Sequence, residues 1–177
     1  MINQKQKLRN YALEYRKSLQ SRGVTEINSN LIVNKILTSK DFVDAHHVAL
    51  YMPLKGEVDL TNIFKIKSKS FYIPRCTGNT LEFAKYEPNN LKLSNFNVLE
   101  PMGDKIDPQI LDLIYIPCLM ANKKCYRLGY GRGYYDRFFA NNKLNAKKII
   151  VVHNDLISDE FIQDDFDYRC DSILSEI

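Results

Sequence analysis

The chain has 177 residues, which is enough for one domain with a substantial buried core. Hydrophobic residues make up 45% and charged residues 26% of the sequence, a composition that excludes a disordered or fibrous chain. No apolar run approaches the roughly 18 residues of a membrane-spanning helix, and the formal net charge of +4 is spread over scattered lysines. We therefore expect neither a membrane nor a nucleic acid as a partner.

The four cysteines are Cys76, Cys118, Cys125 and Cys170, and no two of them form a CxxC pair. No histidine stands at ligand spacing from a cysteine, so a zinc site is not expected. Free thiols are typical of a reducing compartment, and the basic N-terminal segment is not followed by the apolar run of a secretory signal. The sequence therefore predicts a cytoplasmic protein, which we expect to be monomeric.

Two helices are predicted at the start of the chain. Apolar residues recur at helical spacing from Leu8 to Leu19, and Gly23 is the expected end of this helix. A second helix is expected over residues 25–37. Its inward-facing positions are predicted to include Ile27, Leu31 and Ile36.

Short apolar runs then alternate with turns and helices. The predicted strands cover residues 48–52, 70–73, 80–86, 112–116, 148–152 and 172–174. A short helix is expected after Asp59, and a longer one over residues 134–140. Residues 87–110 are rich in Asn, Pro, Gly and Asp and are predicted to be mostly loop.

Strands that alternate with helices predict an α/β fold. We expect one domain over residues 1–177, with a largely parallel sheet flanked by helices in a Rossmann-like three-layer arrangement. In such sheets, ligands bind outside the carboxyl ends of the strands. The segment that follows the strand at 112–116 is therefore the expected binding region.

That segment, residues 127–137, holds three of the seven glycines within five residues, interleaved with arginine and tyrosine. Glycine lets the backbone approach a ligand closely, arginine pairs with phosphate, and tyrosine stacks on flat molecules. Asp136 adds an oxygen ligand of the kind Mg²⁺ prefers. The spacing fits neither a Walker A loop nor a dinucleotide fingerprint. A purely structural turn into the following helix is the alternative.

Three further groups of charged residues are weaker candidates. Lys5, Lys7 and Arg9 begin the first helix, where they form either a solvated basic face or a clamp on a triphosphate. Glu57 follows a strand end and is either a surface charge or the carboxylate that orients a pterin-like edge. The third group, either a surface turn or a contributor to a metal site with Asp136, contains Asp165, Asp167 and Asp171.

Taken together, these segments resemble the 5-formyltetrahydrofolate cyclo-ligase family, also called 5,10-methenyltetrahydrofolate synthetase, almost from end to end. The most specific part is the motif at residues 127–136, which follows Asp112-Leu113-Ile114-Tyr115-Ile116-Pro117. The outer motifs occur in the family's order. They begin at Lys5, Tyr51, Phe71, Leu99 and Asp167. The chain departs from the family pattern at residues 118–122, Asn97, Leu156 and Ile162.

The resemblance implies roles for individual residues. ATP would be held by Lys5, Gln6, Lys7, Leu8, Arg9, Arg127, Leu128, Gly129, Tyr130, Gly131, Arg132, Gly133, Tyr134 and Tyr135. The folate would contact Met52, Glu57, Tyr130, Gly131, Arg132, Gly133 and Tyr134. The Mg²⁺ ligands would be Asp136 and Asp167, and the catalytic residues Arg132 and Tyr134.

The implied activity is the ATP- and Mg²⁺-dependent cyclisation of 5-formyltetrahydrofolate to 5,10-methenyltetrahydrofolate, with release of ADP and phosphate. It would proceed through a phosphorylated formyl group, an imidate phosphate, with the small-molecule folate as the only partner. Two alternatives stay open at this point. They are a folate-binding protein without turnover and a phosphotransferase that acts on another small carbonyl or amide compound.

Overall fold

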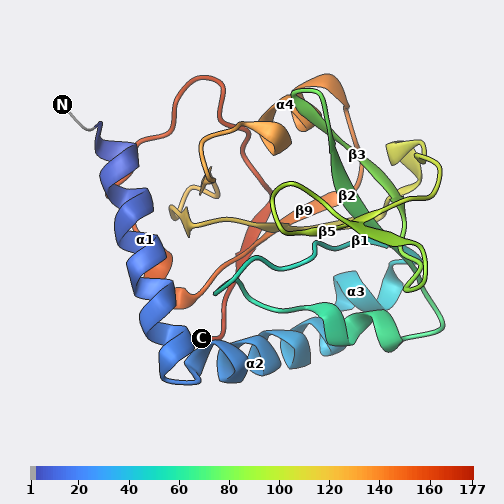
Figure 1. Cartoon of the computed structure of the whole chain (residues 1–177), viewed down its shortest axis with the longest axis horizontal. Coiled ribbons are helices and arrows are strands. Elements are labelled where there is room, and N and C mark those ends of the chain that lie inside the picture. Colours follow the sequence, from blue (N-terminus) through green and yellow to red (C-terminus); the bar gives the residue numbers. More distant parts are fainter. Residues whose placement is uncertain (1–2) are drawn as a thin grey trace.

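A computed structural model describes residues 3–177 and shows a six-stranded central sheet (Figure 1). The strand order is β10-β9-β6-β1-β2-β3. The strands are β1 (His47–Ala49), β2 (Ser70–Thr77), β3 (Thr80–Lys85), β6 (Leu113–Pro117), β9 (Lys147–Val151) and β10 (Ser172–Leu174). Neighbouring strands are parallel except for β2 and β3, which form an antiparallel pair at one edge. The expected largely parallel sheet is thus confirmed.

Helices cover both faces of this sheet (Figure 1). The α-helices are α1 (Gln4–Ser21), α2 (Val24–Thr38), α3 (Lys40–Asp44) and α4 (Tyr134–Asn141). Short 3-10 helices occur at η1 (Thr61–Lys65), η2 (Pro108–Ile110) and η3 (Asn154–Leu156). None of the helices in the described part of the chain is both long and apolar enough to cross a membrane.

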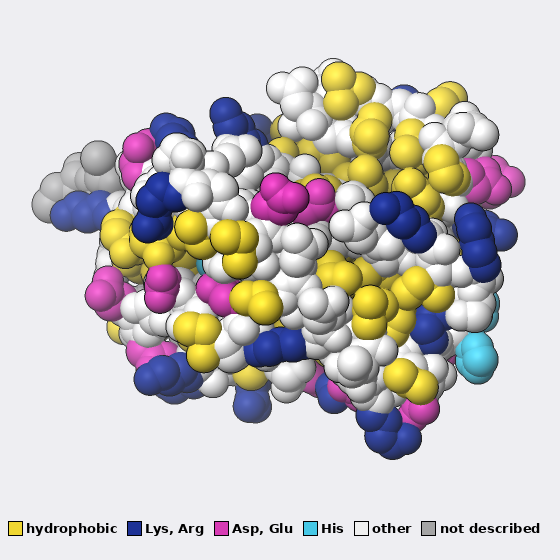
Figure 2. All heavy atoms as spheres, turned by 90° about the horizontal axis from the view of Figure 1, so that it is seen from below, with side chains coloured by type: hydrophobic (Ala, Val, Ile, Leu, Met, Phe, Trp, Pro, Cys, Tyr) yellow, Lys and Arg dark blue, Asp and Glu magenta, His cyan; other side chains and the backbone are white. Residues whose placement is uncertain are grey.

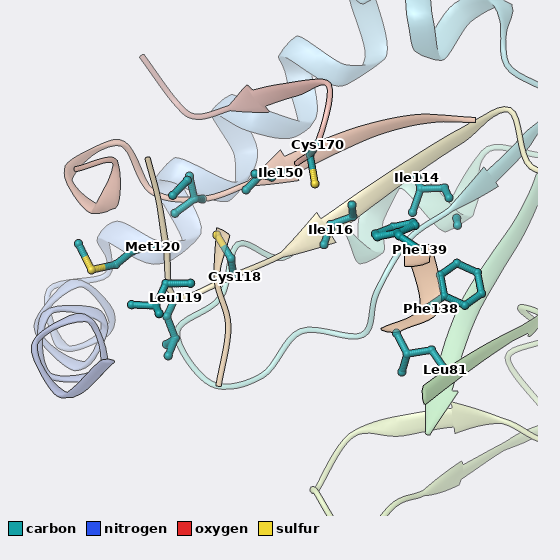
Figure 3. Close-up of a cluster of buried hydrophobic side chains, with 14 of the residues drawn as sticks. Leu81, Ile114, Ile116, Cys118, Leu119, Met120, Phe138, Phe139, Ile150 and Cys170 are labelled. Atoms are coloured by element: carbon teal, nitrogen blue, oxygen red, sulfur yellow. The ribbon is translucent and has the colours of Figure 1, made fainter. Parts of the chain in front are cut away.

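The buried side chains form two clusters, one on each face of the sheet. In β6, Leu113 and Tyr115 belong to the cluster under α2 and α3, whereas Ile114 and Ile116 belong to the other. Successive residues of a strand point to opposite faces, so a continuous apolar strand serves both clusters. Figure 3 shows the second cluster, in which Ile114 and Ile116 lie beside the phenylalanines of α4. This alternation confirms the three-layer α/β fold.

The first helix begins and ends as the sequence predicts. The Asn3 side chain accepts a hydrogen bond from the backbone N–H of Gln6 at 3.1 Å, which caps the N-terminus. Gly23, with a φ of +72°, separates α1 from α2. The buried stripe of α1 contains Leu8, Ala12, Arg16 and Leu19, so a charged residue lies on its apolar side.

The predicted inward face of α2 is wrong at two of its three positions. Ile27 is 58% exposed and Leu31 is 45% exposed, whereas Ile36 is buried as expected. The inward positions are instead taken partly by polar residues whose hydrogen bonds are satisfied. Asn28 bonds the imidazole of His153, and Ser29 accepts the backbone N–H of Asp59. Figure 2 shows apolar groups exposed between charged ones on the face seen from below.

The segment 87–110 is more ordered than its composition predicts. It contains an antiparallel hairpin of β4 (Leu91–Leu93) and β5 (Leu99–Pro101). The Arg75 guanidinium ties this hairpin to the sheet by donating to the carbonyls of Pro101 at 3.0 Å and Gly103 at 2.6 Å. The segment is therefore held both by its own strand pairing and by a residue outside it. Sequence reasoning also missed α3 and the small pair of β7 (Met120–Ala121) and β8 (Arg127–Leu128).

Strand β2 extends further than predicted. The predicted strand covered residues 70–73 and stopped before Pro74, but β2 continues to Thr77 through an antiparallel register with β3. Pairing of β2 with β1 stops at Tyr72, so the missing N–H of Pro74 removes no bond to that neighbour. All four cysteines lie in the described part of the chain, and all four are free thiols as expected.

Candidate functional site

A cavity of about 470 Å³ opens where the carboxyl ends of β1, β2 and β6 meet. Three parts of the chain line most of it: residues 51–57 after β1, residues 74–76 of β2, and residues 127–136. The β4–β5 hairpin adds Phe96, Val98 and Glu100. The cavity therefore lies at the edge of the sheet where the strand pattern predicts ligand binding.

The glycine-rich loop packs against the first helix. The Arg9 side chain donates from Nε to the carbonyl oxygen of Gly129 at 2.9 Å. Gly131 has a φ of +95°, and a Cβ at this position would lie 3.3 Å from the Arg9 guanidinium carbon. Both the conformation and the close contact favour glycine here. The structure thus brings the basic start of α1 and the glycine loop together.

A buried carboxylate lies at the inner end of the cavity. Glu57 is only 3% exposed, which excludes the alternative that it is a surface charge. Its Oε2 accepts the backbone N–H of Leu54 at 2.8 Å, and its Oε1 accepts the hydroxyl of Tyr130 at 2.8 Å. The guanidinium of Arg16 lies 3.7 Å from Oε1. Burial raises the pKa of Glu57 above its ordinary value, although Arg16 and the two hydrogen bonds act to lower it.

A second buried charge faces the same cavity. Arg127 is 6% exposed, and its Nη2 pairs with Asp136 Oδ1 at 2.9 Å. Its Nη1 is buried and has no hydrogen-bond partner in the described part of the chain. A buried guanidinium N–H without an acceptor costs free energy. Arg127 is therefore suited to donate a hydrogen bond to an anionic ligand in the cavity.

The two predicted metal ligands lie in neighbouring segments, because the backbone N–H of Tyr168 donates to Asp136 Oδ1 at 3.0 Å. Asp167 pairs with Lys5 at 2.7 Å, as does Asp164. Within residues 3–177, no group of three acidic, histidine or cysteine side chains lies close enough to hold a metal on its own.

The sequence-predicted residues fall into three sets. Those that line the cavity are Met52, Glu57, Arg127, Gly129, Tyr130, Arg132, Gly133, Tyr134, Tyr135 and Asp136. Those that lie beside it on α1, in the glycine loop or in the C-terminal segment are Lys5, Arg9, Gly131 and Asp167. Those that lie elsewhere are the exposed Gln6 and Lys7 and the buried core residues Leu8 and Leu128.

The mouth of the cavity is aromatic and basic. Phe96 from the hairpin meets the ring of Tyr134 edge to face, with 6.3 Å between ring centroids. The Arg132 guanidinium lies over the Phe96 ring at 5.0 Å. Asn97, one of the positions at which the sequence departs from the pattern it resembles, has a φ of +56°. Asparagine tolerates this left-handed conformation, so the departure preserves the hairpin turn.

Sequence reasoning missed two contributors to this site. Phe96 lies in the segment predicted to be loop, and no sequence pattern placed it near the cavity. Arg16 is buried and donates from Nη1 to the hydroxyl of Tyr130 at 2.7 Å. A signal for Arg16 existed, because it lies four residues after Ala12 and three before Leu19 on the apolar stripe. A charge at such a position indicates a buried partner.

Comparison with known proteins identifies relatives of the whole chain. The sequence model of the 5-formyltetrahydrofolate cyclo-ligase family matches residues 1–176. The 5-formyltetrahydrofolate cyclo-ligase of Mycoplasma genitalium is 30% identical over 128 residues, which cover 72% of this chain and 71% of the relative. That of Mycoplasma pneumoniae is 29% identical over 156 residues, with 85% and 83% covered.

A solved structure agrees as well. The NMR structure of Aquifex aeolicus 5,10-methenyltetrahydrofolate synthetase superposes with a TM-score of 0.85 at 30% identity. The alignment covers 97% of this chain and 89% of that one. With the family model matching nearly every residue, the chain belongs to the 5-formyltetrahydrofolate cyclo-ligase family.

Proposed function

We propose that this chain is a cytoplasmic ligase that cyclises 5-formyltetrahydrofolate to 5,10-methenyltetrahydrofolate, at the expense of ATP and with Mg²⁺. The observation that carries the proposal is the cavity itself. In a chain of this family, it joins a buried carboxylate, Glu57, to a buried cation with an unused donor, Arg127. The first suits the N–H groups of a pterin, and the second suits a phosphate.

The chemistry requires activation of a poor leaving group. The formyl oxygen of the substrate would take the γ-phosphoryl group of ATP, which gives an imidate phosphate and ADP. N10 of the same molecule would then attack the formyl carbon, and phosphate would leave as the ring closes. The formyl group on N5 and the attacking N10 belong to one molecule, so proximity supplies much of the rate acceleration of the second step. The protein's tasks are then to align the two ligands and to neutralise the transferred charge.

The residues present fit these tasks. Arg132 lies exposed at the mouth, where its guanidinium would meet the transferred phosphoryl group, and Tyr134 would orient the folate beside it. Asp136 and Asp167 present carboxylate oxygens in adjoining segments and would hold Mg²⁺. When bound, Mg²⁺ supplies positive charge to the nucleotide phosphates. Lys5 and Arg9 would close the phosphate side from α1.

The decisive experiment follows methenyltetrahydrofolate by its near-ultraviolet absorbance, with ATP and Mg²⁺ present together or omitted singly. We expect product only when both are present. Binding of 5-formyltetrahydrofolate without product would instead establish a folate-binding protein without turnover. ADP release that depends on a different carbonyl or amide compound would establish a phosphotransferase, and either result would overturn the proposal.

A further inference from the structure

Arg16 is a charged residue in an unusual place. It lies in α1, is only 3% exposed, and shares the buried stripe of that helix with Leu8, Ala12 and Leu19. Burial of a guanidinium is costly unless its donors meet acceptors with good geometry. No role in ligand binding follows for Arg16 from the sequence motifs. Its contacts therefore need their own explanation.

Those contacts converge on the proposed folate carboxylate. Arg16 Nη1 donates to the Tyr130 hydroxyl at 2.7 Å, and that hydroxyl donates to Glu57 Oε1 at 2.8 Å. Arg16 Nη1 also lies 3.7 Å from Oε1, and Nη2 donates to the carbonyl of Cys118. Tyr130 accepts from one partner and donates to the other, so the direction of its hydroxyl is fixed. Arg16 thereby connects α1 to the three segments that carry Glu57, Cys118 and Tyr130.

The backbone just before Glu57 packs against Arg16. Gly56 has a φ of +78°, and a Cβ at this position would lie 2.9 Å from the Cβ of Arg16. The turn that carries Glu57 thus lies directly on α1. Each Glu57 oxygen accepts one hydrogen bond from the protein, which leaves acceptor capacity on both oxygens for a ligand in the cavity.

We propose that Arg16 is a positioning residue for the folate, because it holds the Glu57 carboxylate and the Tyr130 hydroxyl in the arrangement that receives the substrate's N–H donors. This role rests on the proposed function. It extends that function to a residue that makes no contact with the cavity itself. Arg16 acts through its charge, which favours the carboxylate, and through its fork, which fixes Tyr130.

The test must separate this role from simple structural support. The titratable and charged groups around Glu57 are Arg16 on α1, Tyr51 after β1, Cys118 after β6, Tyr130 in the glycine loop, Tyr135 on α4 and His153 after β9, whose ring bonds the carbonyl oxygen of the neighbouring Gly56. Burial raises the pKa values of Tyr51, Tyr130, Tyr135 and Cys118 above their ordinary values, so these four groups stay neutral near neutral pH. Arg16 is therefore the group whose charge favours the Glu57 carboxylate near neutral pH.

The experiment compares Arg16→Met with wild type in the binding of 5-formyltetrahydrofolate from about pH 6 to about pH 9. We expect the variant to bind at least about tenfold more weakly at neutral pH. Its affinity should recover as the pH rises, because the Glu57 pKa increases without Arg16. The double variant Arg16→Met/Glu57→Gln should lose this pH dependence. A loss by the same factor at every pH, or no loss, would overturn the role.

Two controls keep the test sharp. Lys17→Met removes a neighbouring charge of α1 whose side chain is 68% exposed, and it should bind the folate as wild type does. Arg16→Lys keeps the charge without the fork, so it should retain the wild-type pH profile with an affinity about threefold lower. If Arg16→Met does not fold, Arg16→Lys decides, and wild-type affinity in that variant would contradict the positioning role.

A ligand-free measurement distinguishes failure of this inference from failure of the proposed function. The Glu57 carboxyl can be titrated by ¹³C NMR in wild type and in Arg16→Met. An upward shift of its pKa by about one unit or more in the variant supports the role of Arg16 even if the chain forms no methenyltetrahydrofolate. An unchanged Glu57 titration would refute it, whatever the catalytic assay shows.

Discussion

Gly56 is a residue at which the first helix leaves no room for a side chain. Its positive φ disfavours any side chain, and an added Cβ would meet the Arg16 Cβ at 2.9 Å. We expect Gly56→Ala to lower the free energy of unfolding by about 2–4 kcal/mol, the cost of a left-handed residue plus overpacking. Gly78→Ala is the matched control, because Gly78 has a φ of +57° but open space around it. Urea denaturation should give a loss of only about 1–2 kcal/mol there.

Arg132 is the residue on which charge neutralisation is proposed to depend. We expect Arg132→Ala to lower turnover by at least about tenfold, which corresponds to about 1.4 kcal/mol of transition-state stabilisation. Turnover is measured at saturating ATP and folate. Arg22→Ala serves as the control, because the Arg22 side chain is exposed and bonds the Ser18 carbonyl of α1, away from the cavity lining. Wild-type turnover in purified Arg132→Ala would reject the assigned role.

Part of the site was predictable at this scale because local sequence carries it. The glycine-rich motif concentrates Arg127, Tyr130 and Asp136 in one loop, and all three line the cavity. Glu57 was predicted from its place after a strand. Phe96 was not predicted, and the apolar stripe of the first helix indicates only that Arg16 is buried, because the partners of both residues lie far away in the sequence. Local patterns do not record which distant carboxylate or hydroxyl a buried arginine meets.

Among the elements, the β4–β5 hairpin is tied to β2 by the side chain of Arg75. Arg75 donates to two carbonyls at the end of the hairpin and pairs with Glu82 at 2.6 Å. We expect Arg75→Met to speed amide hydrogen exchange across residues 91–103 by roughly tenfold or more, since charged hydrogen bonds contribute about 1.5–3 kcal/mol. Lys92→Met, an exposed change on the hairpin itself, should leave exchange unaltered. Equal exchange in both variants would show that the tether is dispensable.

Elements with a clear apolar pattern were predictable. Elements that bury polar side chains, with hydrogen bonds to distant partners, were not. The strand at Leu113–Pro117 was found because it is apolar on both faces. The inward face of α2 was misjudged because it buries Asn28 and Ser29 in place of Ile27 and Leu31. Apolar periodicity counts a polar residue as exposed. The pattern carries no information on the hydrogen bonds that His153 and the backbone of Asp59 make to these two side chains.

For the whole molecule, His153 links three distant parts of the chain. It is 1% exposed, and its ring nitrogens bond Gly56 O and the Asn28 amide, each at 3.2 Å. Asn28 also donates to Glu176 near the C-terminus at 2.9 Å. Donation from an amide on one side and acceptance by a carbonyl on the other require a neutral imidazole. The turn that carries Glu57 is therefore held from the C-terminal side as well as from α1.

This arrangement predicts a pH dependence of stability. Burial lowers the pKa of His153 below its ordinary value, so the unfolded state takes up a proton first as the pH falls. The stability that His153 contributes is thus present above its unfolded pKa and is lost as the pH falls through its folded pKa. The unfolding free energy should decrease from about pH 7.5 to about pH 5.5, and less so in His153→Gln. His46→Gln, at an exposed histidine, should behave like wild type.

Helix α1 contacts two segments that line the cavity, the glycine loop at residues 127–137 and the turn that carries Glu57. Arg9 holds Gly129 of the glycine loop, and seven residues later Arg16 contacts Tyr130 and Glu57. One residue inserted between them would rotate the later arginine by about 100° and shift it by about 1.5 Å. Only one arginine could then keep its partners. The two helical turns between Arg9 and Arg16 therefore fix the distance between these contacts. We expect exposed positions in these turns to tolerate substitution but not insertion or deletion.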